Sequence, residues 1–378
     1  MLTRSFVIIF IVHIIFLSRE SNGQSMYQKV LEVSYEGGPL ISNGKVWADE
    51  LHNVINYQGV DIRLGWRNFS TSPYSFLYRY PVFGIGYSMT LPYYSEIGRP
   101  QAFYAFGEFP FSRKGLTQRF NLSYYGQIGV GFNLNPYDPD LNPVNQFIGS
   151  SMNAYIHLGF KANYKITSQL MAFSTLGLKH YSNGAVKRPN AGINLAPLSI
   201  GLRTNLGKSS IDFPKEMEFP PLEKRWFLNL ALYTGMKNYE IGQSSYFRGG
   251  FGVNYLLEAD YRYRWGAGLD VFFAPGMESR YPDQEFSFSD QVSVAMVGSW
   301  EWKLNEKLFV PIGFGVYVKR NDLNGEFTWF YERVGVRYRL TSNLSAGIQI
   351  KAHKAKADFF EFTLGYTLPR KIRYITYP

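Results

Sequence analysis

Long segments of strict alternation between apolar and polar side chains dominate this sequence. The clearest segment spans residues 119–132, where one set of alternate positions is apolar and the other is mainly polar or glycine, and residues 152–164 repeat the pattern. Successive side chains of a β-strand point to opposite faces, so each segment predicts a strand with one apolar and one polar face. Strands this long are unusual in soluble proteins and typical of outer-membrane β-barrels.

The composition agrees with an all-β, antiparallel barrel, although a soluble β-sandwich with shorter strands is the alternative. Tyr and Phe account for 29 and 31 of the 378 residues, Gly for 36, and the mean hydropathy of −0.18 excludes a protein built of membrane-spanning helices. The chain has no cysteine, so no disulfide holds it together. The formal charge of +10 favours an anionic partner such as phosphate-bearing lipid, while loop charge that only aids solubility would give the same balance.

The first 23 residues have the features of a cleaved signal peptide. Arg4 supplies a positive charge, residues 6–17 form a short apolar run, and the small residues Ser21 and Gly23 precede a cleavage point at Gln24. The apolar run is too short for a spanning helix, and an uncleaved N-terminal anchor is the alternative. We therefore expect export, and the alternating strands predict a location in the outer membrane of a Gram-negative-type bacterium.

The remaining chain divides into two halves. Residues 24–206 carry eight candidate strands, and alternation resumes in residues 225–378 with about eight more. Between them, residues 207–224 contain several prolines and no alternation, which indicates a linker. We expect two tandem eight-stranded barrels, because connections at the periplasmic end of one barrel are normally short; one barrel of about 16 strands is the alternative. The first-half strands are expected at 27–36, 54–66, 79–90, 99–111, 118–133, 151–165, 168–182 and 193–206.

A histidine and a serine end the seventh of these strands. His180 and Ser182 are two residues apart, so they share one face, where the imidazole could take a proton from the hydroxyl. That face carries leucines and alanines, which predicts that it points at lipid. The strand follows a tight turn at residues 165–167, so the pair is expected near the outer leaflet. The simpler interpretation is two solvated residues at a strand end.

The two halves share a short repeat. The segment from Tyr164 to Leu170 matches that from Tyr338 to Leu344 at an offset of 174 residues, and shared turn constraints could also produce the match. The same offset puts Lys354 at the place of His180 and Lys356 at the place of Ser182. We therefore expect a second half that retains the strand and has lost the pair. In its last strands, alternation places Lys351, His353 and Glu361 inside the barrel and Asp358 on the opposite face.

The residues that follow the histidine carry a resemblance. The run from His180 through Ser182, Asn183, Gly184, Asn190 and Gly192 to Asn194 resembles the active-site segment of the outer-membrane lipid A deacylases (PagL type), some of which are called acyloxyacyl hydrolases. Members of that family are eight-stranded barrels that remove an ester-linked acyl chain, typically at the 3 position, from the lipid A of lipopolysaccharide. The resemblance implies a longer, two-part branch of the family, with lipopolysaccharide as substrate.

The resemblance also implies roles for individual residues. Ser182 would be the nucleophile and His180 the general base, and Asn183, Asn190 and backbone amides near Gly184 would bind the oxyanion. The family's acidic third member falls at position 194, where this chain has asparagine. The Asn194 side chain is expected on the same outward face, where its carbonyl could accept a proton from the imidazole but could not stabilise the imidazolium as a carboxylate does. Lower activity or help from another acid is therefore expected, and an inactive site is the alternative.

Other features are weaker. Lys187 and Arg188 follow the serine and could hold lipid A phosphates, or serve only solubility. Asp138 and Asp140 could bind a cation, but loops of this composition are usually only solvated. The sequence contains no Gly-rich phosphate loop, Cys/His cluster or nucleic-acid module, so no metal or cofactor is expected. The rival to the esterase is a non-catalytic barrel, structural or a small porin, with a vestigial Ser/His site; a pair facing the lumen would favour it.

Overall fold

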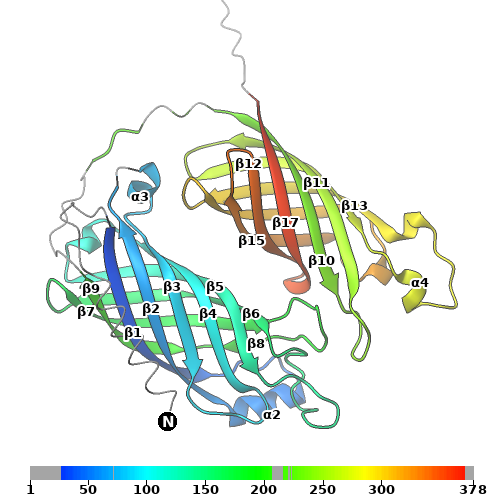
Figure 1. Ribbon diagram of the computed structural model, residues 1–378, viewed down its shortest axis with the longest axis horizontal. Coiled ribbons are helices and arrows are strands. Elements are labelled where there is room, and N and C mark those ends of the chain that lie inside the picture. Colours follow the sequence, from blue (N-terminus) through cyan, green and yellow to red (C-terminus); the bar gives the residue numbers. More distant parts are fainter. Residues whose placement is uncertain (1–26, 71, 207–215, 220–221, 223, 371–378) are drawn as a thin grey trace, which may run out of the picture.

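The computed structural model contains two closed, antiparallel, eight-stranded β-barrels (Figure 1). It describes residues 27–70, 72–206, 216–219, 222 and 224–370. The predicted signal peptide, residues 1–23, and most of the predicted linker, 207–224, lie outside the described residues. Two separate barrels confirm the preferred architecture and exclude the single barrel of about 16 strands.

The first barrel closes where its last strand pairs with both the seventh strand and the first. Its eighth strand is interrupted between β8 and β9, because Pro197 lacks the backbone N–H that a regular ladder needs. The pairing register with β7 is unchanged across this gap. The strands are β1 (Tyr27–Pro39), β2 (Asn56–Asn68), β3 (Val82–Thr90), β4 (Gly98–Pro110), β5 (Phe120–Leu134), β6 (Asn153–Lys165), β7 (Leu170–Ser182), β8 (Ile193–Leu195) and β9 (Leu198–Leu206).

The second barrel closes through pairing of β17 with β10. Its strands are β10 (Trp226–Lys237), β11 (Tyr246–Glu258), β12 (Tyr263–Phe273), β13 (Val292–Lys303), β14 (Leu308–Lys319), β15 (Phe330–Arg339), β16 (Leu344–His353) and β17 (Lys356–Arg370). The helices lie in connections: α2 (Val46–Val54), α3 (Pro73–Leu77), α4 (Met277–Arg280), η1 (Lys114–Leu116), η2 (Phe288–Gln291) and η3 (Asp322–Asn324). No helix in the described part of the chain is long and apolar enough to cross a membrane.

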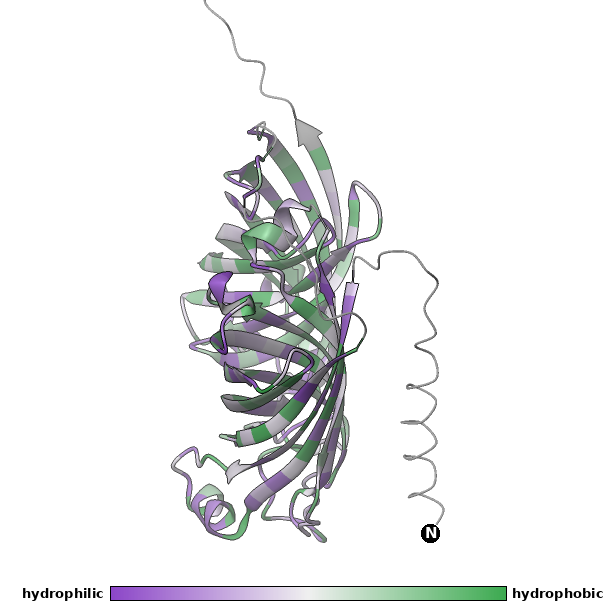
Figure 2. Cartoon of the chain, turned by 90° about the vertical axis from the view of Figure 1, so that its left-hand side faces the viewer, coloured by the Kyte–Doolittle hydropathy of each residue, from purple (hydrophilic) through white to green (hydrophobic). Residues whose placement is uncertain are grey.

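The alternation in sequence becomes an apolar outside and a charged inside. Hydrophilic and hydrophobic residues alternate along the strands (Figure 2), and outward residues such as Phe160 and Ile200 are 63% and 70% exposed. Inside the first barrel, Lys161 Nζ lies 2.6 Å from Glu32 Oε1 and 3.0 Å from Glu108 Oε2. Burial of a charge costs free energy unless the charge is paired, and these ion pairs compensate that cost for the charged side chains that fill the interior.

The interior of the second barrel follows the same principle. Arg333 pairs with Asp270 at 2.7 Å and with Glu361 at 2.8 Å. Lys351, His353 and Glu361 face the interior as expected, but the prediction for Asp358 was wrong. A register shift next to Lys351 makes Asp358 the extra residue of a β-bulge, and its side chain turns inward to within 3.3 Å of Lys351 Nζ.

The repeated heptapeptide forms the turn between the sixth and seventh strands of each barrel. Thr167 Oγ1 accepts a hydrogen bond from the backbone N–H of Leu170 at 3.0 Å, and Thr341 Oγ1 accepts one from Leu344 at 3.0 Å. The match therefore falls at equivalent places, and this shared turn chemistry is one physical reason for it. Descent of both halves from one duplicated barrel remains a prediction.

Two expectations about connections need correction. Lys354 and Lys356 do not lie on the seventh strand of the second barrel, because β16 ends at His353; Lys354 is in a two-residue turn with a positive φ of 52°, and Lys356 begins β17. In the first barrel, the expectation that connections at the periplasmic end are short does not hold throughout. The connection between β2 and β3 lies at the same end as the tight turn after β6, yet it contains α3, whose Phe76 packs against Tyr80.

Candidate active site

The C-terminal end of β7 places His180 and Ser182 on the outside of the first barrel. Leu176 and Leu178 on the same face are 60% and 48% exposed, whereas Lys179 and Tyr181 on the other face are fully buried inside. The predicted outward orientation of the pair is confirmed. Ser182 is the last residue of β7 and is nevertheless only 6% exposed. The surrounding protein therefore limits access to Ser182, and the serine does not stand free in solvent.

Asn194 lies directly across from His180 in the pairing of β7 with β8. The distance between His180 Nδ1 and Asn194 Oδ1 is 2.7 Å. An amide oxygen can only accept, so Nδ1 carries the proton in this contact and Nε2 is left with its lone pair. Gly192, with a positive φ of 81°, lies against the imidazole, and a Cβ there would come within 2.5 Å of His180 Cε1. The ring is therefore held from two sides with its basic nitrogen available.

The serine and the basic nitrogen are neighbours on one face but are not joined by a hydrogen bond. Within the described part of the chain, neither Ser182 Oγ nor His180 Nε2 has a hydrogen-bond partner. Side chains two residues apart in a strand are adjacent on one face. A hydrogen bond between a catalytic hydroxyl and its base often forms only when substrate is bound. The outward face thus carries a serine, a histidine and an asparagine close together, with Asn194 paired to His180 across the two strands.

A tight turn follows the serine. Val186 N donates to Asn183 O at 3.2 Å, and Gly184 and Ala185 both have φ of 60°. Positive φ at both central positions is the type I′ geometry, which favours glycine. The turn leaves the backbone N–H of Gly184 without a partner among the described residues, so this amide can donate to a ligand.

The two asparagines expected as oxyanion donors have different surroundings. Asn190 Oδ1 accepts from the backbone N–H of Asn183 at 3.0 Å, while its Nδ2 has no partner among the residues described. The side-chain amide of Asn183 instead donates to Lys187 O at 2.7 Å and to Ser150 Oγ at 2.9 Å. Asn190 is therefore free to bind an anion through its amide, whereas Asn183 shapes the loop.

The two basic residues of the loop also differ. The Lys187 side chain is exposed, and Arg188 Nε donates to Asn238 O of the second barrel at 3.1 Å. The structure brings Lys187 and Arg188 to the same loop as Ser182, and it uses part of the Arg188 guanidinium for contact between the barrels.

Each barrel matches a known protein family. Residues 40–203 match the family described as lipid A 3-O-deacylase (PagL), and residues 226–371 match the family described as acyloxyacyl hydrolase, C-terminal domain. The chain belongs to the PagL family. It is therefore an outer-membrane β-barrel protein from a hydrolase family whose members act on lipid A. The match covers the first barrel and the second barrel in turn.

The other comparisons add little to this assignment. No curated protein matches the chain significantly. Neisserial surface protein A is 12% identical, over 49% of this chain and all of that one, with a TM-score of 0.29. OccAB4 of Acinetobacter baumannii is 9% identical, over 93% of this chain and all of that one, with a TM-score of 0.24.

Sequence reasoning missed several residues around the site. Ser150, in the connection between β5 and β6, receives a hydrogen bond from Asn183, and Phe147 O in the same connection accepts from Gly192 N at 2.8 Å. The second barrel contributes Asn238, Ser245 and Phe360 to the surroundings of the loop. No local sequence signal marks these residues, because their role depends on contacts between distant parts of the chain.

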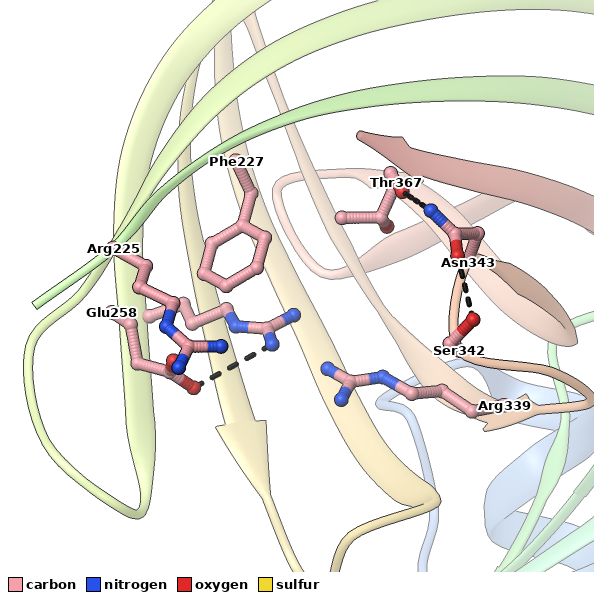
Figure 3. A pocket seen from close by; sticks show the side chains of 8 residues that line it. Arg225, Phe227, Glu258, Arg339, Ser342, Asn343 and Thr367 are labelled. Atoms are coloured by element: carbon pink, nitrogen blue, oxygen red, sulfur yellow. Dashed lines mark hydrogen bonds and ion pairs between the residues drawn. The ribbon is translucent and has the colours of Figure 1, made fainter. Parts of the chain in front are cut away.

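Neither a metal-ligand cluster nor the cavity of the second barrel belongs to the described part of this site. The described residues contain no group of three or more His, Cys, Asp or Glu side chains suited to a metal, and Asp138 accepts from the backbone N–H groups of Asp140 and Leu141 in its own loop. A cavity of about 340 Å³ opens at the far end of the second barrel, where Arg264 pairs with Glu258 at 3.5 Å (Figure 3). Its lining includes Arg339, Ser342 and Asn343 at the turn between β15 and β16, the end opposite to Phe360.

Proposed function

We propose that this protein is an outer-membrane serine esterase that removes an ester-linked acyl chain from the lipid A of lipopolysaccharide. The observation that carries the proposal is the His180 Nδ1 to Asn194 Oδ1 contact at 2.7 Å, with Ser182 beside His180 on the outward face. Membership of a lipid A deacylase family supplies the substrate class. The outward face of the barrel is where the acyl chains of the outer leaflet lie, so a membrane-embedded ester would approach Ser182 from this side, through the limited opening that its 6% exposure leaves.

The chemistry follows from the positions of the donors and acceptors. Ser182 Oγ transfers its proton to His180 Nε2 and bonds to the ester carbonyl carbon. The resulting oxyanion accepts hydrogen bonds from the backbone N–H of Gly184 and from Asn190 Nδ2, neither of which has a partner among the described residues. Collapse of this intermediate breaks the ester bond, and the sugar oxygen leaves with the proton from His180. Water then attacks the acyl-serine, with His180 again as base, and releases the fatty acid.

Binding of the substrate uses charge as well as acyl contacts. Lys187 is exposed next to the site, so its ammonium is placed to pair with a lipid A phosphate. Arg188 would add to this with the guanidinium nitrogens that do not contact Asn238. Asn183 supports the site indirectly, because it holds the loop at Lys187 and Ser150.

The rival function, a non-catalytic barrel, would be favoured by a pair that faces the lumen. The outward placement of His180 and Ser182 supports the enzyme instead, and the lumen of the first barrel holds paired charges such as Lys161 and Glu32. The substitution of asparagine for the family's acid is the feature that agrees with the rival, because it weakens the stabilisation of the imidazolium.

Mass spectrometry of lipid A from cells that express the protein tests the proposal. Wild type should remove one acyl chain, and Ser182→Ala and His180→Ala should leave lipid A intact while retaining the heat-modifiable electrophoretic mobility of a folded barrel. An unchanged acyl pattern with wild type would refute the enzyme. Full activity in Ser182→Ala would refute the assignment of the nucleophile and leave the reaction itself standing.

A further inference from the structure

The turn after Ser182 is held by the second barrel. Asn238 N, just beyond the end of β10, donates to Ala185 O at 2.7 Å, and the Ser245 hydroxyl, just before β11, donates to Val186 O. Arg188 Nε returns a hydrogen bond to Asn238 O. In Figure 1 the outer end of β10 lies next to the β8 end of the first barrel. Two successive carbonyls of the turn are thus bound by the β10–β11 connection.

A ring of the second barrel also supports the turn. Gly184 lies against Phe360 of β17 so closely that a Cβ on Gly184 would be 2.2 Å from Phe360 Cδ2. Phe360 is half-buried, whereas Phe362, on the same strand and the same outer face, is 59% exposed. The backbone whose N–H is available for an oxyanion therefore rests on an aromatic side chain from the other barrel.

The second barrel is itself fixed at its other end. Tyr78, in the connection after α3, donates through its hydroxyl to Lys303 O at 2.6 Å and accepts from Trp302 Nε1 at 2.7 Å. Contacts at both ends of the barrels restrict their relative rotation, so the support under Gly184 is a rigid one. Oxyanion donors are effective only when they are oriented before the reaction, because reorienting them during the reaction costs free energy.

We propose that the second barrel is a positioning element for the catalytic loop of the first barrel. Phe360, Ser245 and the backbone of Asn238 hold residues 184–186, and so fix the Gly184 N–H relative to Ser182. The inference rests on the proposed esterase function, and it gives the second half of the chain a role in the reaction without a catalytic residue of its own.

The test compares Phe360→Ala and Ser245→Ala with Phe362→Ala in the full-length protein in detergent micelles. Phe362→Ala removes an equal ring from the same face of β17 without touching the turn. Hydrogen exchange of the peptide that covers residues 183–192 should be at least about tenfold faster in Phe360→Ala and unchanged in Phe362→Ala.

With lipid A as substrate, kcat of Phe360→Ala should fall by about 10- to 100-fold with KM within about twofold of wild type, the pattern of a misplaced catalytic group. Phe360→Leu should recover part of kcat.

Each outcome separates this inference from the proposed function. A wild-type protein that leaves lipid A intact refutes the esterase, and the exchange measurement then still decides whether the second barrel orders the loop. Equal exchange of residues 183–192 in Phe360→Ala, Phe362→Ala and wild type would overturn the positioning role. Faster exchange with an unchanged kcat would overturn it as well, since the contact would then serve only to join the barrels.

Discussion

His180 donates through Nδ1 to Asn194 Oδ1 at 2.7 Å, across the pairing of β7 with β8. The contact keeps the geometry of a base and its orienting group while replacing a carboxylate with a neutral amide. It holds the tautomer in which Nε2 can accept a proton, but it leaves the imidazolium without a negative neighbour. Asn194 is therefore the residue that most directly limits the proposed reaction.

Asn194→Asp should raise the rate of deacylation. A carboxylate at this position would stabilise the imidazolium that forms as Ser182 attacks, which the neutral amide of Asn194 cannot do. We expect kcat to increase by about tenfold or more. The rate of fatty-acid release from lipid A measures it, with Asn194→Ala as a control that should be slower than wild type. A slower Asp variant would show that the amide is required.

Gly184→Ala should abolish most of the activity. A residue with a side chain is strained by about 1–2 kcal/mol at a positive φ, and here the new Cβ would also collide with Phe360. Gly44→Ala is the matched control, because Gly44 has φ of 79° but no atom within 4 Å of the added Cβ. Turnover of lipid A by both folded variants checks this. If the two variants lose activity equally, the contact with Phe360 is irrelevant to the reaction.

Lys161→Met should destabilise the first barrel. The change removes the partner that Glu32 and Glu108 share with Arg203 and leaves buried carboxylates undercompensated. Removing one member of a buried ion cluster typically costs about 3–5 kcal/mol. The free energy of unfolding in urea, measured in detergent or lipid, should show the loss. Lys165→Met, at the end of the same strand and partly exposed, should change it little; equal effects would contradict the role of the interior pairs.

The loop that contains Asp138 should loosen in acid. Backbone N–H groups of Leu141 and then Asp140 donate to its carboxylate and hold the pKa of Asp138 below its ordinary value. Because the pKa is lower in the folded loop, the ionised carboxylate stabilises the loop fully at pH values above the ordinary pKa of an aspartate. This stabilisation is lost as the pH falls through the lowered pKa of the folded loop. Amide protection of residues 140 and 141 should decline over that range. In Asp138→Asn the same protection should not depend on pH, and a persistent dependence would point to another group.

Much of this architecture could be predicted from alternation and turn chemistry. The expected strand at 168–182 corresponds to Leu170–Ser182, and the split at the linker corresponds to two closed barrels. Asp358 could not be placed in the same way. A bulge adds one residue to one strand of a pair, so it inverts the face of that residue relative to a strict two-residue count.

Local sequence alone determined the period of the strands, the outward face of β7, and the neighbourhood of His180, Ser182 and Asn194, because each depends only on residues close in the chain or directly paired. Tertiary structure decided which groups support the loop after Ser182. Asn238, Ser245 and Phe360 reach residues 184–186 only because the second barrel packs against the first. Such contacts have no periodic signature, since they join surfaces that are distant in sequence and are set by how the two closed barrels dock.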